Sequence, residues 1–228
     1  MKESTVFNAA QAGLQTSGKK YLKNAETMHE SLTDHEDICA DIYCEAVNYG
    51  LFQPDLKDMP YEIHSDLAVI YYLEKVSEEG IITAPLTFEL IKKLGMDEEE
   101  IRNTAWRNTL LKKRAVMMPL SEVLDCECDE DGVTLYVLTN ENMYLGAVTI
   151  LYPDLLDMIA DKLGSDLYIL PSSIHECLLL PEHESIDGAD LRSLVKKVND
   201  SEVGEGEILS YNVYKYSRSD RSVTIDNE

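Results

Sequence analysis

Positive charge is scarce in this sequence. Twenty Lys and Arg residues stand against 43 Asp and Glu residues, which gives a formal net charge of −23 at pH 7 with histidine neutral. An electrostatic field of this sign repels phosphate backbones and anionic membrane surfaces. Direct binding to nucleic acid or to a membrane is therefore not expected. The same charge is compatible either with simple solubility or with docking on a basic protein surface.

Long hydrophobic runs are also missing. The longest nearly apolar stretch, residues 67–73, is far shorter than the roughly 20 residues that a membrane-spanning helix needs. The first seven residues, Met-Lys-Glu-Ser-Thr-Val-Phe, lack the apolar core of a secretory signal. We expect a cytoplasmic protein.

The cysteines do not form a known framework. There are five, an odd number at irregular spacing, so a set of disulfides is not expected. Cys126 and Cys128 form a Cys-x-Cys rather than the Cys-x₂-Cys of a zinc ribbon, and Leu179 stands where a His-Glu-x-x-His zinc helix from His175 would need its second histidine. With glycine also sparse and no phosphate-binding loop present, we predict neither a metal site nor a cofactor.

The hydrophobic pattern predicts an α+β fold. Helical spacing and capping residues over 19–51 predict a helical N-terminal segment, 1–52, with one helix running from Thr33 to Gly50. A mixture of strands and helices follows, so residues 53–228 are predicted to form an α+β domain in which an antiparallel sheet carries helices on one face. The two parts could also form one compact unit. The expected strands are 66–73, 133–139, 146–152, 167–170, 177–180 and 211–216, and the expected helices are 86–95, 97–114, 154–163 and 186–198.

One short segment contains the groups of a hydrolase. Ser172, Ser173, His175 and Glu176 supply a hydroxyl, an imidazole and a carboxylate within five residues. A catalytic triad, however, has to converge from separate elements, and no Gly-x-Ser-x-Gly elbow surrounds either serine. In an extended chain Ser173 and His175 would share one face and Glu176 would lie on the other. The alternative is a structural turn in which Pro171 sets the backbone and the hydroxyls bind local amides.

Two acidic clusters are the candidate contacts for a basic partner. Four consecutive carboxylates open the helix predicted from residue 97, where they also favour the positive end of the helix dipole. The second cluster follows Cys126 in a predicted turn and lacks the alternation and the closing glutamate of an EF-hand. The members of the two clusters are Asp97, Glu98, Glu99 and Glu100, and Glu127, Asp129, Glu130 and Asp131.

Three stretches of the chain resemble a known family. They are residues 59–72 with the following helix to Met96, residues 146–154, and, most specifically, Leu-Tyr-Ile-Leu-Pro-Ser-Ser-Ile-His-Glu at 167–176 with the segments to Val198-Asn199 and to residue 216. Together, over about 59–217, they resemble the bacterial family called domain of unknown function 5688, which is often found near mobile elements. The resemblance implies a bacterial cytosolic protein, supplies no catalytic residue and carries nothing over to the first 50 residues.

Three functional hypotheses follow. The leading one is a non-enzymatic interaction protein that docks on a basic partner, for example an inhibitor that mimics nucleic acid against a defence or nucleic-acid-processing protein. The second is a hydrolase-like enzyme that uses Ser172 or Ser173 with His175 and Glu176. The third is a housekeeping protein with a small-molecule pocket.

Overall fold

The structure is a computed structural model of the 228-residue chain, and it describes residues 21–23, 38–77, 80–125, 134–184 and 186–226. Contacts divide these residues into two compact units. The N-terminal unit contains the described residues up to Arg114, and the C-terminal unit contains those from Ala115 onward. Both units combine helices with sheets that are mainly antiparallel, which confirms the α+β class.

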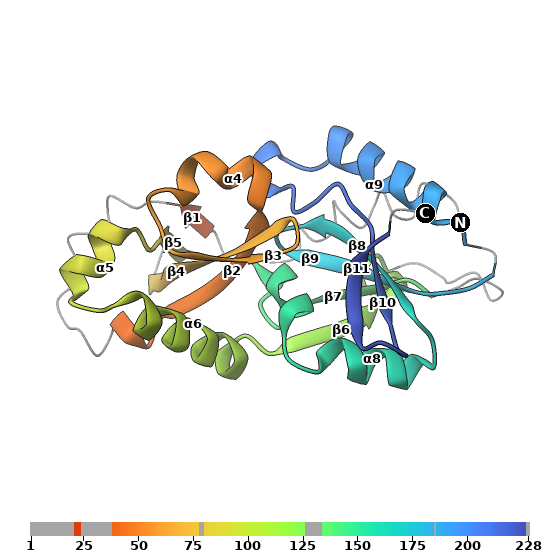
Figure 1. Cartoon of the computed structure of the whole chain (residues 1–228), viewed down its shortest axis with the longest axis horizontal. Helices are drawn as coiled ribbons and strands as arrows, with labels where there is room; N and C mark the ends of the chain where they lie inside the picture. The colour runs from red at the N-terminus through yellow and green to blue at the C-terminus, as the bar shows by residue number, and fades with distance from the viewer. Residues whose placement is uncertain (1–20, 24–37, 78–79, 126–133, 185, 227–228) are drawn as a thin grey trace. The chain divides into compact units, whose positions relative to one another are not determined.

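A sheet with the strand order β1-β5-β4-β2 forms the centre of the N-terminal unit (Figure 1). Strand β4 pairs antiparallel with β2 along one edge, and with β3 and then β5 along the other. The pairing of β1 with β5 is parallel. The elements are β1 (Tyr21–Lys23), β2 (Ile42–Asn48), α4 (Tyr49–Leu56), β3 (Tyr61–His64), β4 (Leu67–Ser77), β5 (Gly80–Pro85), α5 (Phe88–Leu94) and α6 (Glu98–Lys112).

The predicted helical N-terminal segment is not supported. Residues 42–48, expected inside a helix that ends at Gly50, form strand β2, and the other residues of that segment lie largely outside the described ranges. Ile42 and Ala46 are four residues apart, a spacing that suits one face of a helix and one face of a strand equally well. Because β2 pairs with β4 from Ile42↔Leu73 to Asn48↔Leu67, residues on both sides of position 52 share one sheet.

Helices lie on both faces of this sheet rather than on one, as Figure 1 shows for α4 and α6. Ala68 and Ile70 pack with Leu56 of α4 in one hydrophobic cluster. Tyr71 points to the other face, because neighbouring side chains of a strand alternate. Its hydroxyl donates to Glu62, which also accepts a hydrogen bond from Trp106 of α6.

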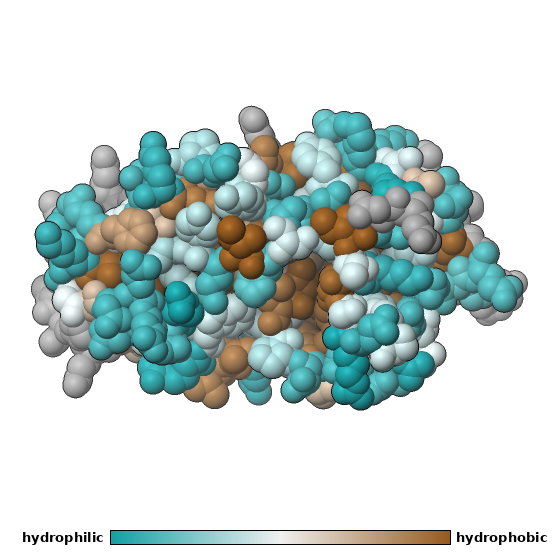
Figure 2. Space-filling model, viewed as in Figure 1, coloured by the Kyte–Doolittle hydropathy of each residue, from teal (hydrophilic) through white to brown (hydrophobic). Residues whose placement is uncertain are grey.

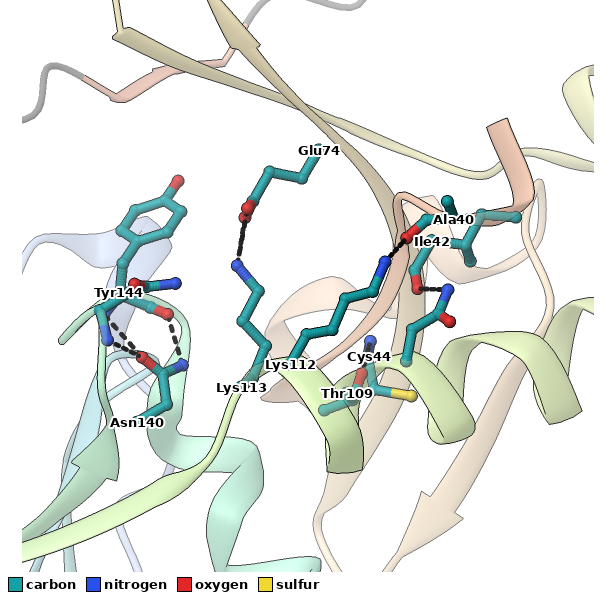
Figure 3. A network of polar contacts seen from close by, with 11 residues as sticks. Ala40, Ile42, Cys44, Glu74, Thr109, Lys112, Lys113, Asn140 and Tyr144 are labelled. Carbon is teal, nitrogen blue, oxygen red and sulfur yellow. Dashed lines mark hydrogen bonds and ion pairs between the residues drawn. The ribbon is translucent and has the colours of Figure 1, made fainter. Parts of the chain in front are cut away.

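Helix α6 also protects the outer edge of β2 (Figure 3). The Thr109 hydroxyl accepts from the Cys44 backbone amide at 2.8 Å, and Asn108 donates to the carbonyl of Ile42 at 3.0 Å. Lys112 donates to the carbonyl of Ala40 at 2.6 Å. An uncovered strand edge invites pairing with another chain, so these side chains replace the missing neighbouring strand.

The C-terminal unit contains an antiparallel sheet with the strand order β11-β10-β8-β9-β7-β6 (Figure 1). Strands β8 and β9 form its central hairpin, in agreement with the connected strand pair predicted at 167–180. The elements are β6 (Ala115–Pro119), α7 (Leu120–Val123), β7 (Tyr136–Asn140), η1 (Gly146–Leu151), α8 (Leu155–Leu163), β8 (Leu167–Ser173), β9 (Glu176–Pro181), α9 (Gly188–Ser201), η2 (Glu205–Glu207), β10 (Tyr214–Ser217) and β11 (Ser222–Ile225).

Both faces of this second sheet are covered as well. Tyr168 and Leu170 of β8 pack against Leu191 and Val195 of α9. On the other face, the hydroxyl of Tyr216 in β10 donates to Asp157 of α8. The prediction of helices on a single face is therefore wrong for each unit, because the central strands are apolar on both sides.

The strand expected at 146–152 is instead the 3₁₀ helix η1. Its β-branched residues suit a strand, but its first two amides are already bound elsewhere. Gly146 donates to the carbonyl of His175 at 3.0 Å and Ala147 donates to that of Ile174 at 3.2 Å. The Thr149 hydroxyl then donates back to the Gly146 carbonyl at 2.7 Å and closes the turn.

Candidate functional site

The candidate segment Ser172, Ser173, His175 and Glu176 lies at the tip of the β8–β9 hairpin. Ser173 pairs with Glu176 across the hairpin, and Ile174 and His175 form the turn between them. All four side chains are buried. The opposite faces expected for an extended chain do not apply here, because the chain bends at residues 174–175 and pairs Ser173 with Glu176 across the hairpin.

Glu176 is a buried carboxylate that is held by neutral groups. The Ser173 hydroxyl donates to its Oε1 at 3.2 Å. Burial raises the pKa of Glu176 above its usual range, although the nearby His175 and hydrogen bonds from the hydroxyls of Ser172 and Ser173 favour the charged form. The two serines thus act here as hydrogen-bond partners of a buried carboxyl group.

His175 does not face the serine hydroxyls with either ring nitrogen. Its Nδ1 accepts a hydrogen bond from the backbone amide of Leu145 at 3.1 Å, and its Nε2 lies 3.8 Å from Oε1 of Glu207. The ring stacks on Tyr144 with centroids 5.0 Å apart. The Ser173 hydroxyl contacts His175 only through the backbone, where it accepts from the amide at 3.0 Å. Activation of a serine needs a hydrogen bond to the imidazole itself, and the described residues form none.

Residues that the sequence did not indicate complete the surroundings of this turn. The Thr139 hydroxyl donates to the carbonyl of His175 at 2.7 Å, and the Ile174 amide donates to the carbonyl of Glu207 at 2.9 Å. The backbone of Gly146 approaches so closely that a Cβ there would lie 2.2 Å from Oγ1 of Thr139. In the sequence, Gly146 followed by Ala-Val-Thr indicated only the start of a strand. The turn is therefore a junction between β7, the 141–145 loop with the start of η1, and η2.

Of the first acidic cluster, two members have structural roles. Asp97 caps α6 by accepting from the Glu100 amide at 2.9 Å, and the Glu100 side chain accepts from the Asp97 amide at 3.0 Å. This reciprocal capping box confirms the helix start predicted there. Glu98 and Glu99 are exposed in the same turn. The second cluster, Glu127, Asp129, Glu130 and Asp131, lies outside the described residues.

Many basic side chains in both units are engaged by carboxylates of the same chain. The Lys113–Glu74 pair is buried, with Nζ 2.7 Å from both carboxylate oxygens (Figure 3). Lys113 also lies 4.6 Å from the ring centroid of Tyr43. Burial, followed by the charges of Glu74 and Asp41, raises the pKa of Tyr43 to about 12. Further cations that pair with carboxylates among the described residues include Lys75, Lys93, Arg102, Arg192, Lys196, Lys215, Arg218 and Arg221.

Within the described ranges, no three His, Cys, Asp or Glu side chains are arranged to hold a metal ion. None of the helices described there is long and apolar enough to cross a membrane. The face of the molecule drawn in Figure 2 is mostly hydrophilic, with hydrophobic residues scattered between the polar ones.

A family model matches residues 5–218, nearly the whole chain, and its description is a family of unknown function, DUF5688. The chain belongs to this family. The match confirms the resemblance seen at 59–217 and extends it to the N-terminal residues, where the motifs carried nothing over. No curated protein and no solved structure matches the chain.

Proposed function

We propose that this DUF5688 chain is a non-enzymatic interaction protein that docks through its acidic surface on a basic surface of a partner protein. The observation that carries the proposal is the excess of acidic residues, together with the ion pairs that many basic side chains form with carboxylates of the same chain. Even if all 20 basic residues were paired with carboxylates, 43 − 20 = 23 acidic residues would remain.

The ion pairs support this interpretation. Arg218 and Arg221 in the β10–β11 turn bind Asp161 and Asp157 of α8, and Lys215 binds Glu182. Basic side chains that are already held in this way add little positive field around the molecule. The field that an approaching partner meets is therefore negative, which accelerates encounter with a basic surface.

An inhibitor that occupies a nucleic-acid-binding groove is the specific version we favour. Such a groove presents lysines and arginines to phosphates, and carboxylates on a folded chain can engage the same side chains through charge-assisted hydrogen bonds. The hydrolase alternative is less well supported, because the ring nitrogens of His175 face Leu145 and Glu207 rather than a serine.

Affinity capture at low salt, followed by elution with increasing salt, tests the proposal. The full chain is immobilised, proteins from a bacterial lysate are bound at low salt, and the bound fraction is eluted with increasing salt. We expect a basic or nucleic-acid-handling protein whose purified form binds the chain and competes with its own nucleic acid. Captured proteins that lack a basic surface, or binding that ignores ionic strength, would contradict the proposal.

Exposed carboxylates of α6 allow a matched test of the surface. Glu98→Gln with Glu99→Gln removes two charges from the first turn, whereas Glu184→Gln with Asp190→Asn removes two exposed charges from the C-terminal unit. We expect the first pair to weaken binding to the purified partner more than the second. Equal effects would mean that the α6 turn is not the contact surface.

A further inference from the structure

His175 is a buried titratable group whose two ring nitrogens have different partners. Nδ1 accepts from the Leu145 amide, and a backbone amide can only donate, so Nδ1 carries no proton in this arrangement. The proton of the neutral ring is therefore on Nε2, which lies 3.8 Å from the Glu207 carboxylate. The His175 side chain is only 9% exposed.

The segment that His175 holds has a strained backbone. Met143 and Leu145 both have positive φ, 52° and 51°, a region that residues with a Cβ adopt at a cost. Two hydrogen bonds hold Leu145 in this conformation. Its own backbone amide donates to Nδ1 of His175, and the backbone amide of the following Gly146 donates to the His175 carbonyl. One of these two anchors depends on the protonation state of an imidazole.

We infer that His175 is a proton-sensitive connector. The neutral ring holds the 141–145 loop through a hydrogen bond from the Leu145 amide, and protonation of the ring breaks that hydrogen bond and draws the ring toward Glu207. When Nδ1 also takes up a proton, its N–H group points at the N–H group of Leu145. The Leu145 amide therefore loses its hydrogen-bond acceptor. The Glu207 carboxylate, on η2, gains a charged hydrogen-bond donor in exchange.

Three titratable groups from the surrounding elements face the ring. Glu207 on η2 lies 3.8 Å from Nε2, and the carboxyl group of Glu176 on β9 is close enough to interact electrostatically with the ring. Tyr144, on the loop itself, stacks on the ring and moves with the loop. The connector does not depend on which partner the acidic surface binds.

Hydrogen exchange of the full chain tests this inference. Exchange of a peptide covering residues 140–150 is measured at about pH 7.5 and about pH 5.5, on either side of the usual imidazole range, and is corrected for the intrinsic rate. We expect roughly tenfold less protection at the lower pH, the change that loss of about one hydrogen bond produces. Equal protection at both pH values would overturn the inference.

Three variants assign the response. In His175→Asn the amide oxygen occupies the branch position of Nδ1 and cannot be protonated, so the loop should stay protected at both pH values. His183→Asn, at an exposed histidine, should leave the response unchanged. If His175→Asn retains the response, or if Glu176→Gln abolishes it, the connector is not His175.

Glu207→Gln provides a test that does not require replacement of the buried ring. Loss of the carboxylate removes the group that stabilises the imidazolium, so the midpoint of the loop transition should move to lower pH. Glu207 is the more exposed partner, with 37% of its side chain accessible. An unchanged midpoint in Glu207→Gln would overturn the inference. This test remains valid even if the His175→Asn variant does not fold.

Discussion

The two units each bury a carboxylate, and they stabilise it by different means. In the N-terminal unit, Glu74 faces the ammonium of Lys113 at 2.7 Å from both of its oxygens. In the C-terminal unit, Glu176 is held by the serine hydroxyls of its own hairpin, with Ser173 at 3.2 Å. The first carboxylate is therefore in direct contact with a charged group, whereas the second is hydrogen-bonded by neutral hydroxyls. Burial raises the pKa of Glu176, although the nearby His175 and the two serine hydroxyls favour its charged form.

This difference determines how the stability of each region depends on charge pairing and on pH. A buried ion pair is sensitive to the loss of either member, because the remaining charge has no other compensation. A buried carboxyl group among hydroxyls can instead take up a proton and remain hydrogen-bonded. The N-terminal unit thus depends on charge pairing, whereas the hairpin tip of the C-terminal unit can respond to pH.

Removal of the ammonium should have the largest effect. Lys113→Ala leaves Glu74 buried without its cation and should lower the free energy of unfolding by about 3–5 kcal/mol. Lys112→Ala is the matched control, since Lys112 is exposed, donates to the Ala40 carbonyl and lies 6.0 Å from the centroid of the Tyr43 ring. We expect the control to cost about 1 kcal/mol or less. Urea unfolding of both variants measures the difference, and equal losses would show that the ion pair is not what stabilises this region.

A methyl group at Gly146 should disrupt the C-terminal network without changing any charge. Its Cβ would lie 2.7 Å from the backbone nitrogen of Asn140 and 2.7 Å from the backbone oxygen of His175. It would lie still closer, at 2.2 Å, to Oγ1 of Thr139. We expect Gly146→Ala to destabilise the chain by about 1–3 kcal/mol, as overpacking does.

Gly206→Ala is the control for this change, because no atom lies within 4 Å of the corresponding Cβ. Its effect should stay within about 0.5 kcal/mol. Thermal unfolding compares the two variants. Similar shifts in melting temperature would mean that the close approach of the backbone to the hairpin turn is not required.

Neutralisation of the buried carboxyl group should change the pH dependence rather than the fold. A raised pKa means that the folded state binds the Glu176 proton more readily than the unfolded state. The wild-type chain should therefore lose stability as pH rises from the ordinary glutamate range through the raised pKa. Glu176→Gln has no proton to lose, so its stability should exceed that of the wild type increasingly with pH.

Urea unfolding at a series of pH values from about 4.5 to about 8 measures this effect as the difference between variant and wild type. We expect the effect to be smaller than that of Lys113→Ala. A constant difference across the series would show that Glu176 has the same affinity for protons in the folded and unfolded states.

The smallest effect on stability is expected at the exposed carboxylates. Glu98→Gln with Glu99→Gln leaves the capping box of Asp97 and Glu100 intact. It should lower the free energy of unfolding by less than about 1 kcal/mol, through weaker interaction with the helix dipole. Thermal unfolding measures this loss, and a cost close to that of Lys113→Ala would mean that these side chains are structural rather than available to a partner.

Local signals in the sequence predicted several elements of the fold. The carboxylates from Asp97 begin α6, Gly164 ends α8 with φ of 72°, and the apolar residues around Leu191 and Val195 form the inner face of α9. Each of these signals is a contact within one helix or a single buried stripe. Such features depend on neighbouring residues and so can be recognised without the tertiary structure.

The rest depended on distant contacts. Strand β2 is buried on both faces, so it lacks the alternation that marks a half-exposed strand. At the start of the 3₁₀ helix η1, the amides of Gly146 and Ala147 bind carbonyls almost 30 residues away, contacts that no local pattern shows. A similar separation applies to the candidate segment: the partners of His175, Leu145 and Glu207, come from segments that no local pattern connects to it.

Association kinetics with the purified partner are the most direct test of the proposed function. The association rate constant of the full chain is measured by stopped flow over a series of salt concentrations. The acidic-surface proposal predicts a rate that falls by roughly tenfold or more as ionic strength rises, with a smaller slope for the Glu98→Gln, Glu99→Gln variant. A rate constant that is the same at all salt concentrations would contradict it.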